Sequence, residues 1–209
     1  MRPLLLLAFL LVQADASAYQ STVRAVNGDV MLARDGQTIQ LTSSGRDSQP
    51  VFSSDMQHIA FVRAANAGEP EDLWVVDIKR SLEPRPLHIE ASAAAKSGEV
   101  ASILQVQFSP DASSIYFYTQ PGNFGLILKV NEVTGTVDLV SHSVIPLNHQ
   151  LFEVVQRGNY AGDLIVQKDS HKLAPGRLFL YWLVDRDGRD VAIIGNSPAD
   201  LSAFRDQIH

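Results

Sequence analysis

The chain has 209 residues, a formal net charge of −6 and no cysteine. This length suits one domain with its own core, and that core must be stable without disulfides or thiolate metal sites. The Lys and Arg residues are scattered, whereas nucleic acid or anionic lipid requires a basic patch. We therefore expect neither nucleic acid nor membrane insertion.

Residues 1–18 have the pattern of a signal peptide. Arg2 supplies a positive charge, and the apolar run Leu4–Val12 is too short to cross a bilayer. The small residues of Ala16-Ser17-Ala18 predict cleavage before Tyr19. An uncleaved membrane anchor is the alternative. We expect a protein that is periplasmic or secreted, and soluble after cleavage.

Short β-rich runs follow, each bounded by Gly, Pro, Asp, Asn or Ser, which is the pattern of strands. Many such strands in close succession indicate an all-β protein. The predicted strands are Asp29–Ala33, Thr38–Thr42, His58–Arg63, Asp72–Ile78, Ser114–Thr119, Gly125–Asn131, Thr136–Ser141, Asp163–Lys168, Arg177–Val184 and Asp190–Ile194.

The turns between these strands recur at intervals of about fifty residues, a period typical of β-propellers and other β-repeat arrays. Asp35-Gly36, Thr134-Gly135 and Asp187-Gly188 each separate two apolar strands, and such pairs tolerate the positive φ of tight hairpins. A longer turn at Lys79–Pro86 falls between the first two.

Two stretches repeat one motif: PVFSSDMQHIAFV (Pro50–Val62) and QFSPDASSIYFY (Gln107–Tyr118). We expect the Asp of each copy to close a turn by accepting a backbone N–H two residues on. The paired apolar residues, two apart, should face one side of a sheet. The motif residues are Phe52, Ser53, Asp55, Ile59 and Phe61 in the first copy, and Phe108, Ser109, Asp111, Ile115 and Phe117 in the second.

Both stretches resemble the repeat of TolB-like, WD-type β-propellers, whose core reads x-W/F-S-P-D-G-x-x-I-A-F. Ser54 stands where the family has Pro, and Met56 and Ala112 stand where it has Gly. Ile39–Pro50 resembles the family's link between blades, and Glu71–Ile78 its third strand. The resemblance is good over Asp29–Ser141 and weak beyond it.

The resemblance implies a small β-propeller, or a partial one, of about four repeats over residues 19–196. An ordinary antiparallel sandwich is the alternative. Four units either close into a small ring or form an incomplete ring that caps its edges or pairs with another chain. A C-terminal helix over residues 197–209 could be such a cap, because Ser197-Pro198 is a helix start and Leu201, Phe204 and Ile208 share one face.

The sequence contains no G-x-S-x-G, H-E-x-x-H, P-loop or G-x-G-x-x-G motif. We therefore expect no enzyme, with no catalytic residues, metal or cofactor. Asp185–Asp190 could suggest a calcium loop, but a hairpin turn is the favoured interpretation. Asp169-Ser170-His171 is taken as a polar loop, and His142 and His149 as exposed loop residues rather than zinc ligands.

The predicted function is that of a binding or scaffold protein that docks a protein or peptide through propeller loops. The loops near Asp55 and Asp111 and the turn Gln120–Gly125 are candidate contacts. Homo-oligomerisation is a further expectation. Candidate contact residues are the aromatic side chains Tyr116, Tyr118, Phe124 and Trp182, for which the core is the alternative.

The competing hypothesis is a hydrolase or a ligand-sensing protein with a polar site on the propeller axis. It requires polar side chains to converge there. If His58, His142, His149 and His171 are scattered over the surface, this hypothesis loses its candidate residues.

Overall fold

The computed structural model describes residues 21–64, 71–87, 89, 102–120, 125–145, 151–169 and 179–208. They form antiparallel strands and a C-terminal helix, which confirms the predicted all-β class. The strands are β1 (Thr22–Val26), β2 (Asp29–Arg34), β3 (Gln37–Gln40), β4 (Asp47–Phe52), β5 (His58–Arg63), β6 (Asp72–Asp77), β7 (Arg85–Pro86), β8 (Ile103–Phe108), β9 (Ser114–Thr119), β10 (Gly125–Asn131), β11 (Val137–Ile145), β12 (Glu153–Val154), β13 (Leu164–Asp169), β14 (Phe179–Val184) and β15 (Asp190–Gly195), and the helix is α2 (Pro198–Ile208).

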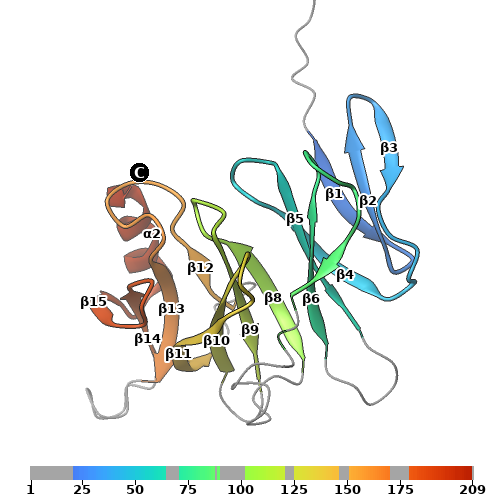
Figure 1. The fold of residues 1–209 in the computed structure, drawn as a ribbon. Helices are drawn as coiled ribbons and strands as arrows, with labels where there is room; N and C mark the ends of the chain where they lie inside the picture. Colours follow the sequence, from blue (N-terminus) through green and yellow to red (C-terminus); the bar gives the residue numbers. More distant parts are fainter. Residues whose placement is uncertain are drawn as a thin grey trace, which may run out of the picture.

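The strands make four blades in chain order: β1–β3, β4–β7, β8–β11 and β12–β15. Successive strands of each blade pair in antiparallel fashion. The third and fourth blades form one continuous sheet, because the end of β11 pairs with β13 through Val144–Lys168 and Ile145–Gln167. Figure 1 shows the four blades in an open arc, with the first and fourth at opposite ends. Of the expected architectures, the partial propeller is therefore the one adopted.

Strands β5 and β9, which contain the second half of each repeat motif, divide their side chains between the two faces of a blade. Ile59 and Phe61 are fully buried against the first blade. Ile115 and Phe117 are fully buried against the second blade. The prediction that each pair shares one side of its sheet is thus confirmed, and the period of two explains it.

Apolar side chains fill each space between neighbouring blades, because one blade cannot bury its own apolar faces. Between the first and second blades lie Val30, Leu32, Leu41, Ile59, Phe61 and Val76. Between the second and third lie Ala60, Val62, Leu73, Val75, Val106, Phe108, Ile115 and Phe117, among others. Between the third and fourth lie Tyr116, Tyr118, Ile127, Val140, Phe152, Leu164, Val166 and Val184, among others.

Helix α2 covers the outer face of the fourth blade, where the next blade of a longer propeller would stack. Leu201 and Ile208 are buried and Phe204 is half-buried against this blade. Ser197 and Asp200 cap the helix reciprocally, because each side chain accepts the backbone N–H of the other at 3.0 and 3.2 Å. The predicted helix and its apolar face are confirmed.

Several predictions fall outside the described residues: the signal peptide, Phe124, His149 and Ser170-His171, as well as the side chain of His142. In the part of the chain that the structure describes, no helix has the length and apolar character needed to span a membrane.

Candidate functional site

The turns after β4, β8 and β12 lie at the same end of their blades, the upper end in Figure 1. We call this end the turn face; it comprises residues 53–57, 109–113 and 155–163. The first two turns touch, because the Ser54 hydroxyl donates a hydrogen bond to the carbonyl oxygen of Pro110. The two repeat motifs, distant in sequence, thus form one continuous surface.

The first motif builds a closed turn from its own polar atoms. The Ser53 hydroxyl donates to Asp55 Oδ1 at 2.5 Å and accepts the N–H of His58 at 2.9 Å. Asp55 Oδ1 also accepts the N–H of Gln57 at 3.0 Å, as predicted. Burial raises the pKa of Asp55, but the hydrogen bonds from Ser53 and Gln57 outweigh it, and the net pKa lies below the ordinary value.

The second motif repeats this geometry. The Ser109 hydroxyl donates to Asp111 Oδ1 at 2.6 Å and accepts the N–H of Ser114 at 3.0 Å. Asp111 Oδ1 accepts the N–H of Ser113 at 3.1 Å. The hydrogen bond from Ser109, opposed by burial and assisted by Ser113, lowers the pKa of Asp111. In both copies the main role of the Ser and the Asp is therefore to close the turn.

The two residues that replace the family's Gly adopt the conformation that Gly is suited to. Met56 has a φ of 57° and Ala112 a φ of 58°. Both φ values lie in the left-handed region, which is energetically unfavourable for any residue that has a Cβ atom. Of the motif aromatics, Phe108 is buried between the second and third blades and Phe52 is half-buried against the first.

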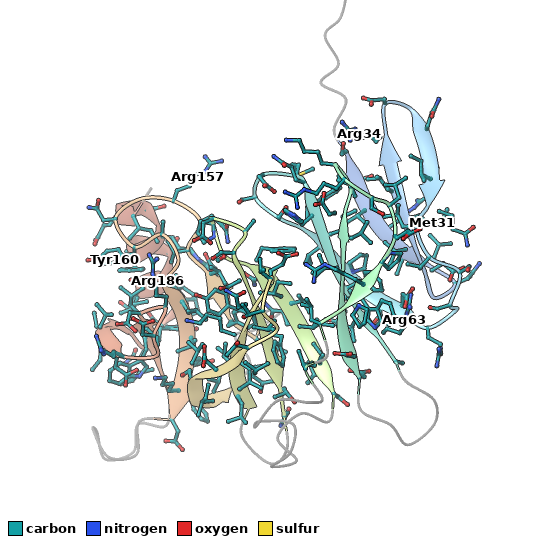
Figure 2. The ribbon with its side chains drawn as sticks, viewed as in Figure 1. Met31, Arg34, Arg63, Arg157, Tyr160 and Arg186 are labelled. Atoms are coloured by element: carbon teal, nitrogen blue, oxygen red, sulfur yellow. The ribbon has the colours of Figure 1, made fainter. Side chains whose placement is uncertain are left out.

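A cavity of about 270 Å³ opens between the third and fourth blades at the turn face, and we call it the inter-blade cavity. Its polar wall comes from the second motif, from β9 and β10, and from the β14–β15 turn. Figure 2 shows Arg186 of that last turn beside the fourth blade. The polar lining residues are Ser109, Asp111, Ser113, Ser114, Tyr116, Lys129 and Arg186.

Backbone carbonyls hold the basic residues of this cavity in place. Lys129 Nζ donates to the carbonyl oxygen of Arg186 at 2.9 Å, and the Arg186 guanidinium donates to that of Ala161 at 3.1 Å. Burial raises the pKa of Tyr116 to about 12. Burial also raises the pKa of Asp163, which Arg186 only partly offsets. The sequence did not predict Lys129 or Arg186 as site residues, because Lys129 belongs to no motif and Arg186 lies in the stretch Asp185–Asp190, which was interpreted as a hairpin turn.

A second depression of about 260 Å³, the inner groove, lies where the innermost strands of the second and third blades meet. Phe52, Ser54, Gln107, Phe108 and Gln156 contribute to its lining. The inner groove and the inter-blade cavity flank the second motif. Together they give the turn face two depressions, each fixed by rigid turns.

Glutamine side chains connect the innermost strands of neighbouring blades. Gln49 Nε2 donates to the carbonyl oxygen of Ile103 at 2.7 Å. Gln105 Nε2 donates to that of Phe152 at 2.8 Å, and Gln107 Oε1 accepts the N–H of Val154 at 3.0 Å. These amides replace the backbone pairing that separated strands cannot make.

The structure corrects the candidate contact role of two aromatic residues. Tyr116 and Tyr118 are 2% and 0% exposed and pack between the third and fourth blades. They are core residues, because alternation directs them away from Ile115 and Phe117 and the fourth blade covers them. Trp182 is half-buried in the same core, and its indole nitrogen has no hydrogen-bond partner among the described residues.

His58 lies between two carboxylates of the second blade. Its Nδ1 is 3.8 Å from Asp55 Oδ1 and its Nε2 is 3.9 Å from Asp77 Oδ2. The described residues contain no group of three or more His, Cys, Asp or Glu arranged to hold a metal ion. Whether the four histidines cluster stays a prediction, since the other three side chains lie outside the described part.

The acidic stretch Asp185–Asp190 forms the β14–β15 turn, as its favoured interpretation predicted. Asp185 Oδ1 accepts the N–H of Asp187 at 2.9 Å and that of Arg189 at 2.8 Å. The carboxylate therefore closes a hairpin through backbone hydrogen bonds.

No family model and no curated protein matches the sequence. Solved structures do match its fold. A TolB protein from Agrobacterium tumefaciens is 15% identical with a TM-score of 0.54, and the match covers 79% of this chain and 55% of that one. The β-propeller domain of the Trilobed protease from Pyrococcus furiosus is 13% identical with a TM-score of 0.52, covering 82% and 51%. Oligogalacturonate lyase from Vibrio parahaemolyticus is 16% identical with a TM-score of 0.53, covering 82% and 47%.

These similarities show a TolB-like β-propeller fold. The chain spans about half the length of the matched chains. Because this fold occurs in a TolB protein, in a protease and in a lyase, it does not by itself decide activity.

Proposed function

We propose that this protein binds another protein or a peptide at the turn face. The observation that carries this proposal is the pair of depressions, the inter-blade cavity and the inner groove, on either side of the second motif. Binding residues that lie on loops held by a rigid scaffold are the usual arrangement for recognition. The hydrogen-bonded Ser-Asp turns and the apolar layers between blades supply that rigidity.

We propose binding rather than catalysis because the polar side chains between the first strands of neighbouring blades already have structural roles. The amides of Gln49, Gln105 and Gln107 join neighbouring inner strands. A partner would then meet a preformed surface and not a reactive group.

We also propose that the protein acts outside the cytoplasm, in the periplasm or after secretion. The support is the N-terminal sequence, with its short apolar run and its Ala16-Ser17-Ala18 site. N-terminal sequencing of the exported protein should begin at Tyr19. An intact N-terminus in the exported fraction would contradict cleavage.

The binding proposal is tested by affinity capture of tagged residues 19–209 from the exported fraction, with mass spectrometry of the proteins that copurify. We expect one partner in near-stoichiometric amount. Gln156→Arg, which places a bulky cation in the inner groove, should reduce its yield. Gln207→Arg is the matched control, because Gln207 is exposed on α2. A preparation with nothing bound, or equal loss in both variants, would contradict the proposal.

A further inference from the structure

Two of the three charged residues that line the inter-blade cavity are cations. Its charged lining residues are Lys129, Arg186 and Asp111, which makes two cations and one carboxylate. Asp111 is committed to its turn, since its Oδ1 accepts hydrogen bonds from Ser109 and Ser113. Two further carboxylates act on these cations: Asp187 lies 3.9 Å from Lys129 Nζ, and Asp163 interacts with Arg186.

Lys129 presents unused hydrogen-bond donors at this position. Its side chain is only 19% exposed, and it projects from β10 beside Tyr116, its cross-strand neighbour. Nζ donates to the carbonyl oxygen of Arg186. The carboxylate of Asp187 is 3.9 Å away, beyond hydrogen-bond distance. An ammonium has three donors, so two remain without an acceptor among the described residues.

Further donors line the same cavity. The Arg186 guanidinium has five N–H groups, of which one bonds to Ala161 in the described structure. The Ser114 hydroxyl also lines the cavity and makes no hydrogen bond with a described residue. A ligand with several acceptor oxygens would accept hydrogen bonds from Lys129, Ser114 and the exposed Arg186 together.

The size of the cavity limits the ligand. At about 270 Å³ it falls below the range of about 300–1,000 Å³ that is usual for drug-sized ligands. One side chain or one terminal residue fits better than a whole cofactor. A carboxylate is the anion that proteins and peptides carry most often, and Arg and Lys bind it through charge-assisted hydrogen bonds.

We propose that the inter-blade cavity binds a carboxylate of the partner, from an Asp or Glu side chain or from a free C-terminus, between Lys129 and Arg186. This proposal rests on the proposed function, whose partner it describes more closely. The Asp187 carboxylate, mostly exposed beside Lys129, competes with the ligand. Removing it should therefore strengthen binding.

The test is an NMR titration of isotope-labelled protein with three small probes. N-acetylglycine carries a terminal carboxylate, the α-amide of N-acetylglutamate a side-chain carboxylate, and N-acetylglutamine amide neither. We expect the carboxylate probes, and not the neutral one, to shift the amide signals of Ser114, Gly162 and Arg186. The carboxylate probe that binds more tightly shows whether the partner's carboxylate is a C-terminus or a side chain.

Variants assign the binding to the two cations. Lys129→Met and Arg186→Met should each raise the dissociation constant at least about tenfold, whereas Asp187→Asn should lower it. Arg80→Met is the control, since Arg80 is an exposed cation of the second blade. Thermal unfolding checks that the two Met variants are folded. If Lys129→Met is unstable, Arg186→Met still tests the inference, because Arg186 is exposed.

Equal shifts with the neutral probe, or unchanged affinity in both Met variants, would overturn the inference. If a partner is captured equally well by Lys129→Met and Arg186→Met, the cavity has no part in its binding, while the binding function stands. If the probes bind as expected but no partner is captured, the cavity is confirmed and the proposed function fails.

Discussion

Replacing Asp47 by Asn should destabilise the protein strongly, because Asp47 belongs to a buried ion pair. Its side chain is 0% exposed, and that of its partner Arg63 is 17% exposed. Two hydrogen bonds join them: Arg63 Nε to Oδ1 at 2.6 Å and Nη2 to Oδ2 at 2.9 Å. The Asp47 N–H also donates to the carbonyl oxygen of Gly28 at 2.7 Å, which connects the pair to the first blade.

The expected loss of stability follows from the Arg63 charge, which has no carboxylate partner in the variant. Removing one partner of a buried ion pair costs about 3–5 kcal/mol, because the other charge stays uncompensated. Arg63 keeps some contact with water and its cation–π contact with Trp74, whose ring centre is 3.9 Å away. We therefore expect the lower end, a loss of about 3 kcal/mol in the free energy of unfolding.

Urea denaturation measures this loss as a lower midpoint at an unchanged slope. Asp35→Asn is the matched control: Asp35 also pairs with an arginine, Arg34, but both side chains are more than half exposed. It should cost less than about 1 kcal/mol. If the two variants lose similar stability, burial does not increase the contribution of the Asp47–Arg63 pair.

The same pair predicts a pH dependence. Burial raises the pKa of Asp47, but hydrogen bonds from Arg63, Thr42 and Ser44 outweigh it, so the folded pKa lies below the ordinary value of about 3.9. This stabilisation is present above the unfolded pKa and is lost as the pH falls through the folded pKa. The difference between wild type and Asp47→Asn should therefore shrink in acid. A constant difference would contradict the linkage.

Three further predictions concern the turns and the cap, all measured by urea denaturation. Met56→Gly should raise stability by about 0.5–1 kcal/mol, because the relief of left-handed strain exceeds the extra entropy of the unfolded chain; a lower midpoint would refute this. Ser53→Ala should lower stability by about 2 kcal/mol, because Asp55 loses a donor and the His58 N–H an acceptor; a loss below about 0.5 kcal/mol, as for an ordinary surface change, would refute it. Leu201→Ala should cost about 2 kcal/mol by opening the contact between α2 and the fourth blade; an unchanged midpoint would show that the helix does not stabilise the blade.

The sequence predicted the strands that carry their own signal. β5 and β6 begin where the β-rich runs His58–Arg63 and Asp72–Ile78 begin. It did not predict β4 as a separate strand, since β4 is rich in polar residues and contains Gln49, with a φ of 51°. Pairing with β5 and the contact of Gln49 with the third blade hold β4 in place instead. Local strand propensity does not predict such tertiary contacts.

The repeat motifs were the most informative part of the sequence, because a turn closed by Ser and Asp uses atoms within five residues of one another. Hydrogen bonds of this range are encoded locally, and so is the alternation that sends Ile115 to one face and Tyr116 to the other. These features could be derived without knowledge of the neighbouring blade.

Tertiary structure alone decided what each face meets. Alternation could not show that a fourth blade buries Tyr116 and Tyr118, or that α2 covers the outer face of the fourth blade. It could not show that Lys129 of β10 and Arg186 of the β14–β15 turn line one cavity. The reason is physical: these contacts join residues about one repeat or more apart, and their energy comes from burial between blades, for which a single blade's sequence has no local pattern.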